Sequence, residues 1–403
     1  MRDHYARFAP ESGDVGVRTI GVVTVGRSDY GLYLPVLRAL RSSADVRLQL
    51  FVSGMHLSAL HGGSVAIIER DGFPITERIP TLTESDTPEA VAKAIAAGVS
   101  GFAAAYARQR PDIVVVLGDR FDMYAAAVAA LPFRIPVAHI HGGELTQGAI
   151  DDALRHSMTK LSHLHFVSTE VYARRVQQLG EEPWRITVSG APGLDNLESV
   201  RRLSRQELEA ALGFGLASPL LLVTFHPVTL QYEQVGRHCA ELLAALEEIG
   251  VPVVFTLPNA DTGGLMVARL IREFVDRSHN ARLVDNLGTE LYVNLMEQAS
   301  VMVGNSSSGI IEAPSLGLPV VNIGLRQAGR VRAGNVIDVA EDRAGIVASI
   351  RTALTPAFRD HARECANPYY AGAPAAGMIA KRLASIPLDE RLTMKLFQDV
   401  RFS

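Results

Sequence analysis

The densest group of residues that could do chemistry lies between positions 139 and 165, which hold five of the twelve histidines in this 403-residue chain. His141 is followed by Glu144, and Asp151 comes shortly after. A histidine beside a carboxylate can move protons near neutral pH. We interpret this segment as a candidate acid–base centre, with structural histidines and a metal site as the alternatives. The H-E-x-x-H spacing is missing and no cysteine lies nearby, so we expect no metal.

A further acidic position, Asp119, stands in the motif Gly118-Asp119-Arg120-Phe121-Asp122, directly after a valine-rich run at residues 113–117. A carboxylate at the carboxyl end of such a strand faces the cleft where parallel sheets bind ligands. We therefore expect Asp119 to be catalytic and its neighbour Arg120 to contact substrate. Asp119 could also cap the next helix, and the two roles are compatible.

Three basic residues have the surroundings of anion sites. Arg27 follows Gly26 at a strand end and precedes a helix, so a guanidinium and a helix N-terminus come together. The G-x-G-x-x-G spacing of dinucleotide-binding folds is missing there. His226 occupies the equivalent place in the second half of the chain, and Arg326 follows a later strand. A capped turn with a surface arginine and an ordinary loop histidine are the alternatives.

The segment Asn305-Ser306-Ser307-Ser308-Gly309 precedes an apolar helix that contains Glu312. Hydroxyl groups, free backbone N–H groups and a helix dipole together favour a phosphate. Glu312 lies about one turn into the helix, where a carboxylate can accept the two hydroxyl groups of a ribose. A diphosphate beside a ribose indicates a nucleotide, with a helix-capping cluster as the alternative. The candidate contacts are Asn305, Ser306, Ser307, Gly309 and Glu312.

These motifs follow the strands of a pattern in which short Val- and Ile-rich runs alternate with amphipathic segments. Such strands are typical of parallel sheets that helices cover on both faces. The predicted strands are residues 19–25, 46–52, 113–117, 135–140, 220–225, 251–256, 300–303 and 319–323. The predicted helices are residues 32–41, 121–131, 232–249, 264–277, 290–298 and 309–316. We therefore predict an α/β fold of two doubly wound Rossmann-like domains that face a cleft.

A segment rich in glycine, proline and charge, residues 190–203, separates the two series and predicts a hinge. We expect an extension over 1–16 and an N-terminal domain with the acid–base side over 17–195. A C-terminal domain with the nucleotide side would cover 196–373, followed by a helix and tail over 374–403. The amphipathic stretch 375–385 could pack on either domain.

Composition argues against several classes of protein. The 39 Lys and Arg against 43 Asp and Glu give a net charge of −4, which disfavours a nucleic-acid binder. Cys239 and Cys365 form no metal or disulfide pattern and indicate a reduced, intracellular setting. No apolar run reaches the roughly 18 residues of a membrane span, and the first 17 residues lack the apolar core of a signal peptide. We expect a cytoplasmic protein without membrane contact.

Six blocks, in order along the chain, resemble the UDP-N-acetylglucosamine 2-epimerase family, and most closely its hydrolysing branch in sialic-acid and legionaminic-acid synthesis. The blocks are RSDYG, GDRFD, HIHGGELTQGAIDDALRHS, TFHPVT, GNSSSGIIEAPSLGLPVVNIGLRQAGR and GNVIDV, within residues 17–339. The resemblance implies a GT-B-type fold with an interdomain active site. It implies elimination of UDP from a UDP-2-acetamido sugar, a glycal intermediate, and addition of water to give the free sugar inverted at carbon 2. The product from UDP-N-acetylglucosamine would be N-acetylmannosamine, and no cofactor would take part.

The resemblance also implies individual roles. Asp119 and Asp151 match acidic catalytic positions, and His141 stands where several relatives have Glu, so it either moves a proton or orients Glu144. His226 matches a histidine near the diphosphate and is a further catalytic candidate. The residues that match UDP-binding positions are Arg27, Ser306, Ser307, Glu312 and Arg326. Relatives are usually homodimers or homotetramers. A GT-B glycosyltransferase and a non-catalytic UDP-sugar sensor are the other classes, and the sugar is open between UDP-N-acetylglucosamine and UDP-N,N'-diacetylbacillosamine.

Overall fold

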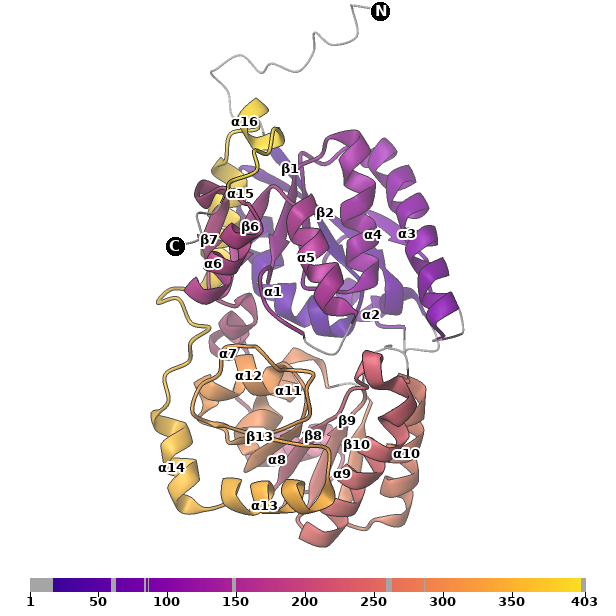
Figure 1. Ribbon diagram of the computed structural model, residues 1–403, viewed down its shortest axis with the longest axis vertical. Helices are drawn as coiled ribbons and strands as arrows, with labels where there is room; N and C mark the ends of the chain where they lie inside the picture. The colour runs from indigo at the N-terminus through magenta and orange to yellow at the C-terminus, as the bar shows by residue number, and fades with distance from the viewer. Residues whose placement is uncertain are drawn as a thin grey trace, which may run out of the picture.

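The computed structural model describes residues 17–58, 63–82, 85, 87–146, 150–258, 263–285 and 287–399. The chain folds into two α/β domains stacked along the long axis of the molecule, the N-terminal domain above the C-terminal one in Figure 1. Each domain has its own apolar core around a parallel sheet. The extension expected over 1–16 lies outside the described residues.

The N-terminal domain contains a seven-stranded parallel sheet in the order β3-β2-β1-β4-β5-β6-β7. Its strands are β1 (Arg18–Thr24), β2 (Val46–Ser53), β3 (Glu77–Ile79), β4 (Ile113–Leu117), β5 (Val137–Ile140), β6 (Leu164–Val167) and β7 (Ile186–Val188). The helices are α1 (Arg27–Ser42), α2 (Val65–Arg70), α3 (Pro88–Gln109), α4 (Phe121–Ala130), α5 (Asp151–Leu161) and α6 (Glu170–Gln178), with α7 (Asp195–Ser199) leading to the second domain. Strands β1 and β4 are buried throughout, as expected for the centre of a sheet with helices on both faces.

The C-terminal domain contains a six-stranded parallel sheet in the order β10-β9-β8-β11-β12-β13. Its strands are β8 (Leu221–Thr224), β9 (Val253–Thr256), β10 (Ala281–Val284), β11 (Val301–Gly304), β12 (Val320–Ile323) and β13 (Val336–Val339). The helices are α8 (Arg205–Leu212), α9 (Val235–Ile249), α10 (Gly264–Arg277), α11 (Gly288–Gln298), α12 (Ser308–Ile311), α13 (Arg343–Ala353) and α14 (Pro356–Glu364). In both sheets the strand order reverses at the centre, between β1 and β4 and between β8 and β11. Such a reversal opens a crevice at the carboxyl ends of the strands.

The predicted α/β fold of two doubly wound domains is confirmed, and each of the eight predicted strands is present. The pattern missed β3, β6, β7, β10 and β13, which have only three or four residues each. Helix α1 begins five residues earlier than predicted, so that Arg27 lies in its first turn.

The end of the chain returns to the N-terminal domain, where it is drawn in yellow in Figure 1. Helix α15 (Ala375–Ser385) packs beside α1, and its Ile379 and Leu383 belong to the N-terminal core. Arg18 donates from Nη1 to the Leu383 carbonyl at 2.7 Å. The short helix α16 (Glu390–Thr393) follows, and Arg185 donates to the Leu392 carbonyl at 2.8 Å. The sequence left open which of the two domains residues 375–385 pack on. In the structure they pack on the N-terminal domain.

Helix α3 is long and apolar enough to cross a membrane by length and composition alone. This corrects the expectation that no apolar stretch reaches that length. The helix packs along α4, and its Phe102, Ala105 and Tyr106 are buried in the N-terminal core. These contacts are those of a helix that covers a sheet.

Candidate active site

A cavity of about 580 Å³ lies between the two domains. The segments after β1, β4 and β5 line it on one side, and those after β8, β11 and β12 line it on the other. This is the position expected for a ligand site, at the carboxyl ends of the central strands. The candidate residues that line the cavity are Arg27, Asp119, Arg120, His141, Glu144, Asp151, His226, Ser306, Ser307, Glu312 and Arg326.

His141 and Glu144 form a pair in a tight turn after β5. His141 has a φ of 65° and Gly143 a φ of 77°, which turns the chain so that Nδ1 of His141 lies 2.6 Å from Oε1 of Glu144. Ser168 donates from Oγ to the same oxygen at 2.8 Å. Burial raises the pKa of Glu144, but the neighbouring His141 and arginines lower it by more, so its pKa lies below the usual range. Glu144 is therefore ionised.

The protonation of Glu144 determines what the imidazole can do. An ionised carboxylate only accepts hydrogen bonds, so Nδ1 of His141 carries a proton and donates it to Glu144, which leaves Nε2 as the ring nitrogen available to a ligand. This Nε2 is buried without a hydrogen-bond partner among the described residues, and His141 lines the cavity. A histidine that a carboxylate orients in this way can take a proton from a bound substrate, or return one once it is protonated.

Asp119 is bound by a different set of partners. Arg155 of α5 contacts its Oδ2, and Thr146 donates to the same oxygen at 3.1 Å. Arg155 also donates from Nη1 to the His141 carbonyl at 2.7 Å, so one buried guanidinium joins Asp119 to the histidine turn. Burial raises the pKa of Asp119, but Arg155 and two further arginines lower it by more. Asp119 is thus ionised and a weaker base than an unpaired aspartate.

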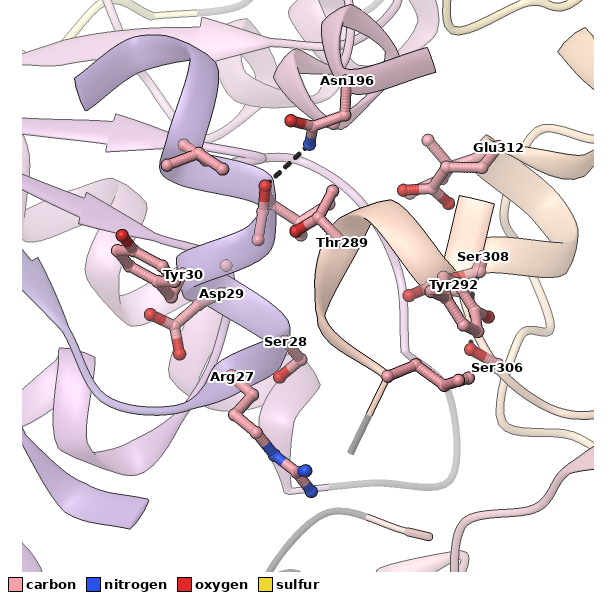
Figure 2. Close-up of a pocket in the computed structure, with 18 of the residues that line it drawn as sticks. Arg27, Ser28, Asp29, Tyr30, Asn196, Thr289, Tyr292, Ser306, Ser308 and Glu312 are labelled. Carbon is pink, nitrogen blue, oxygen red and sulfur yellow. Dashed lines mark hydrogen bonds between the residues drawn. The ribbon is translucent and has the colours of Figure 1, made fainter. Parts of the chain in front are cut away.

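The opposite wall contains the Ser306–Ser308 turn and Glu312, shown in Figure 2. Glu312 is 7% exposed, and its Oε2 has no hydrogen-bond partner among the residues described. Burial raises the pKa of Glu312 to about 7. Tyr292 of α11 hydrogen-bonds with Ser306 and Ser308, while burial raises the pKa of its hydroxyl to about 12. A carboxylate with an unpaired acceptor oxygen can bind a diol.

The helix after the serine turn is shorter than the predicted 309–316. Helix α12 has only four residues, and the 3-10 turn η7 (Ala313–Leu316) follows it. The break has a physical cause, because Pro314 lacks the backbone N–H that an α-helix needs at that position. A four-residue helix has a small dipole, so phosphate binding here would depend on the hydroxyl and backbone N–H groups themselves.

Two of the proposed substrate contacts do not line the cavity. Asn305 is 1% exposed, and it joins the loops after β8 and β11. Its Oδ1 accepts from the His226 backbone N–H at 2.7 Å, and its Nδ2 donates to the His226 carbonyl at 2.9 Å. A Cβ at Gly309 would lie 2.9 Å from Val320, so this glycine permits close packing of α12 on β12. Asn305 therefore positions His226, and Gly309 positions the serine turn.

Polar contacts between the domains border the cavity. Arg27 donates from Nη1 to the Asp285 carbonyl of the other domain at 2.6 Å. Asn196 donates to the Gly31 carbonyl at 2.7 Å, along the dashed line in Figure 2. Arg326 comes from the C-terminal domain and lines the same cavity as Arg27. Cations of both domains thus face one space, as an anionic ligand between them would require.

Sequence reasoning did not assign several residues that shape this site, among them Arg155, Ser168 and Tyr292. Arg155 follows Asp151 by four positions, a spacing that places both on one face of α5. From that spacing the sequence could have indicated that Arg155 lies on the same side of the helix as the candidate Asp151. Ser168 follows β6, a strand that the apolar pattern missed, so its place at the carboxyl edge of the sheet could not be inferred.

An interdomain cavity with cations on both walls, an oriented histidine and a buried carboxylate places this protein among the GT-B-type enzymes that act on nucleotide-linked sugars. A model of the UDP-N-acetylglucosamine 2-epimerase family matches residues 38–384. The chain belongs to that family, and to its hydrolysing branch. The resemblance inferred from the motifs is therefore confirmed.

Individual relatives agree with this assignment. The chain is 40% identical over 323 residues to the GDP/UDP-N,N'-diacetylbacillosamine 2-epimerase (hydrolyzing) of Campylobacter jejuni. This match covers 80% of this chain and 84% of that protein. It is 38% identical over 338 residues to the UDP-N,N'-diacetylbacillosamine 2-epimerase (hydrolyzing) of Legionella pneumophila. That match covers 84% of this chain and 89% of the Legionella protein. The solved structure of UDP-GlcNAc 2-epimerase from Neisseria meningitidis bound to UDP-GlcNAc has the same fold, with a TM-score of 0.78 at 21% identity over 91% of this chain and 99% of that chain.

Proposed function

We propose that this enzyme converts UDP-N,N'-diacetylbacillosamine into UDP and the free sugar inverted at carbon 2. The observation that supports this sugar is the identity of 40% and 38% to two relatives of that name, over at least four-fifths of the chain. UDP-N-acetylglucosamine, which would give N-acetylmannosamine, is the alternative. Either product would enter sialic- or legionaminic-acid synthesis in the cytoplasm.

Binding of the nucleotide is the first task that the site performs in this proposal. Glu312 accepts hydrogen bonds from the ribose hydroxyl groups at its unpaired oxygen, and Ser306 and Ser307 donate hydrogen bonds to the diphosphate. When the bond between carbon 1 and the diphosphate breaks, negative charge develops on the leaving group. Arg27 and Arg326 line the cavity from opposite domains, and cations aimed at developing charge act strongly in a sheltered site.

Removal of the proton at carbon 2 is the second task, and it needs a base on the sugar side. We assign it to Nε2 of His141 in its unprotonated form, because Glu144 orients the ring through Nδ1 and Nε2 has no hydrogen-bond partner among the described residues. The electron pair of the carbon–hydrogen bond becomes the double bond of the glycal as UDP departs. Asp119, which the sequence led us to expect as a catalytic residue, is a weaker candidate for this base because Arg155 pairs with it.

Inversion at carbon 2 requires a second proton-transfer group, since the new proton must arrive on the opposite face. Asp119 and Asp151 are our candidates, because both line the cavity in the N-terminal domain and both match acidic catalytic positions of the family. In its acid form, one of them passes a solvent proton to carbon 2 while the hydroxyl of a water molecule adds to carbon 1.

Incubation of the protein with each UDP-sugar in deuterated water, without any acceptor, tests the proposal. We expect UDP and free sugar to form together, with deuterium at carbon 2 and a higher kcat/KM for the diacetylated substrate. Retention of hydrogen at carbon 2 would indicate simple hydrolysis. A higher kcat/KM for UDP-N-acetylglucosamine would reassign the sugar, and a requirement for an acceptor would favour a glycosyltransferase.

A further inference from the structure

Arg330 belongs to the C-terminal domain, but its guanidinium contacts the acid–base turn of the N-terminal domain. The residue follows β12 and is 8% exposed. Its Nη1 lies 3.3 Å from Oε2 of Glu144, and its Nε donates to the Leu145 carbonyl at 2.9 Å. One side chain therefore holds both the carboxylate that orients His141 and the backbone beside that carboxylate.

The backbone next to Arg330 is also attached to residues outside its own loop. The Val331 N–H donates to the Tyr172 hydroxyl at 2.9 Å, and the Val331 carbonyl accepts from the Tyr369 hydroxyl at 2.9 Å. The two tyrosine hydroxyl groups lie 2.8 Å apart, and both residues are fully buried. These contacts fix the origin of the Arg330 side chain relative to Glu144.

The same segment reaches the nucleotide side of the cavity. Arg326 and Gln327 donate to the Asn305 carbonyl at 3.2 and 2.8 Å. Asn305 directly precedes the serine turn and holds the backbone of His226. Residues 326–331 therefore contact the nucleotide side at one end and the acid–base turn at the other.

We propose that Arg330 is a positioning residue, which joins the nucleotide side of the site to the His141–Glu144 pair and holds that pair with Nε2 facing the cavity. The inference rests on the proposed function, because it gives Arg330 a role in the same reaction. Arg330 acts through Glu144 in this view and does not exchange protons itself.

Several other charged or titratable groups surround the pair. Arg155 of α5 lies 3.9 Å from Glu144, and the remaining groups are Asp119 after β4, Glu312 after α12, Tyr172 of α6 and Tyr369 before α15. Loss of Arg330 would leave Arg155 beside the carboxylate but would remove a cation and the contact to the C-terminal domain. Because a lost cation favours the protonated form of the pair, the pH profile of kcat should move to higher pH.

The first experiment compares Arg330→Gln, Arg330→Lys and Arg351→Gln. The Arg351 side chain is 65% exposed and pairs with Glu248, so its variant controls for net charge. For Arg330→Gln, assayed at pH 8 where Glu312 is mostly ionised, we expect kcat to fall about ten- to hundredfold with a UDP affinity within about twofold of wild type, since the contact that is lost is the one to the acid–base turn. Arg330→Lys should recover part of kcat. A parallel loss of UDP affinity and kcat/KM, with the pH profile unchanged, would make Arg330 a substrate contact and overturn the proposal.

The second experiment separates this inference from the choice of reaction. The double variant Glu144→Gln/Arg330→Gln should lose little more activity than Glu144→Gln alone, because both changes act on one interaction. Without substrate, the imidazole N–H proton signal that disappears in His141→Gln should be broadened or shifted in Arg330→Gln. An unchanged signal would overturn the positioning role even if neither UDP-sugar reacts, whereas a changed signal without turnover would count against the proposed function alone.

Discussion

Glu312 offers a sharp test of the nucleotide side, because its charge and its proposed ligand are coupled. Burial raises the pKa of this carboxyl from the ordinary 4.5 to about 7. Below pH 7 the group is therefore mostly neutral in the free protein, and it must lose a proton before it can accept two hydroxyl groups as a carboxylate. Above pH 7 it is already ionised. The affinity for UDP should therefore fall as the pH decreases through 7.

The size of the effect follows from the ionised fraction. If the ionised form alone binds, that fraction is about nine-tenths at pH 8 and one-tenth at pH 6, so the apparent Kd rises about tenfold between them. Glu312→Gln removes a charge-assisted hydrogen bond, which contributes about 1.5–3 kcal/mol. The variant should therefore bind UDP about 10- to 150-fold more weakly at pH 8, because each 1.4 kcal/mol is a factor of ten.

Isothermal titration calorimetry of UDP at pH 6, 7 and 8 measures both effects. UDP itself titrates in this range, so the informative quantity is the difference between wild type and Glu312→Gln. Glu273→Gln, which changes an exposed glutamate paired with Arg269, controls for net charge. An equal pH dependence in wild type and Glu312→Gln, or an unchanged affinity in the variant, would refute the assignment of Glu312 to the ribose.

Three further predictions concern the N-terminal domain. Asp119→Asn should suppress formation of the free 2-epimeric sugar while calorimetry still detects UDP binding, because Asp119 lines the cavity as a candidate for the group that returns the proton to carbon 2; a fully active variant would exclude Asp119 from the mechanism. Asp29 has a pKa raised by burial from 3.8 to about 7, so between these values the folded state retains a proton that the unfolded state releases. Stability should therefore fall as the pH rises through 7, and Asp29→Asn should flatten the plot of Tm against pH, whereas a parallel plot would contradict the pKa. Gly143→Ala would place a Cβ 2.6 Å from the Tyr172 carbonyl at a φ of 77°, so denaturant unfolding should show a loss of about 1–3 kcal/mol; wild-type stability and kcat would show that the turn can relax.

The sequence was sufficient for the centre of each sheet and insufficient for the edges. Strands such as β4, with the run IVVVL, are buried on both faces, so their apolar pattern is unbroken. Strand β13, with the sequence VIDV, is partly exposed and carries an aspartate, which interrupts its apolar pattern. Short edge strands depend on pairing with a neighbour, which is a tertiary property.

The same distinction applies to the candidate site. Sequence position correctly brought His141, Asp119, His226 and the serine turn to one cavity, because all of them follow the carboxyl ends of parallel strands. Sequence position could not distinguish a side chain that faces a ligand from one that hydrogen-bonds with a neighbouring loop. Asn305 illustrates this limit, since an amide directly after a strand satisfies both descriptions, and its hydrogen bonds to His226, 79 positions away in the chain, decide between them. Arg330 shows the converse case, because its contact with Leu145 spans 185 positions and joins two domains that the sequence pattern treats separately. A site between two domains is thus predictable from its strand ends, whereas the groups that orient its chemistry depend on how the domains meet.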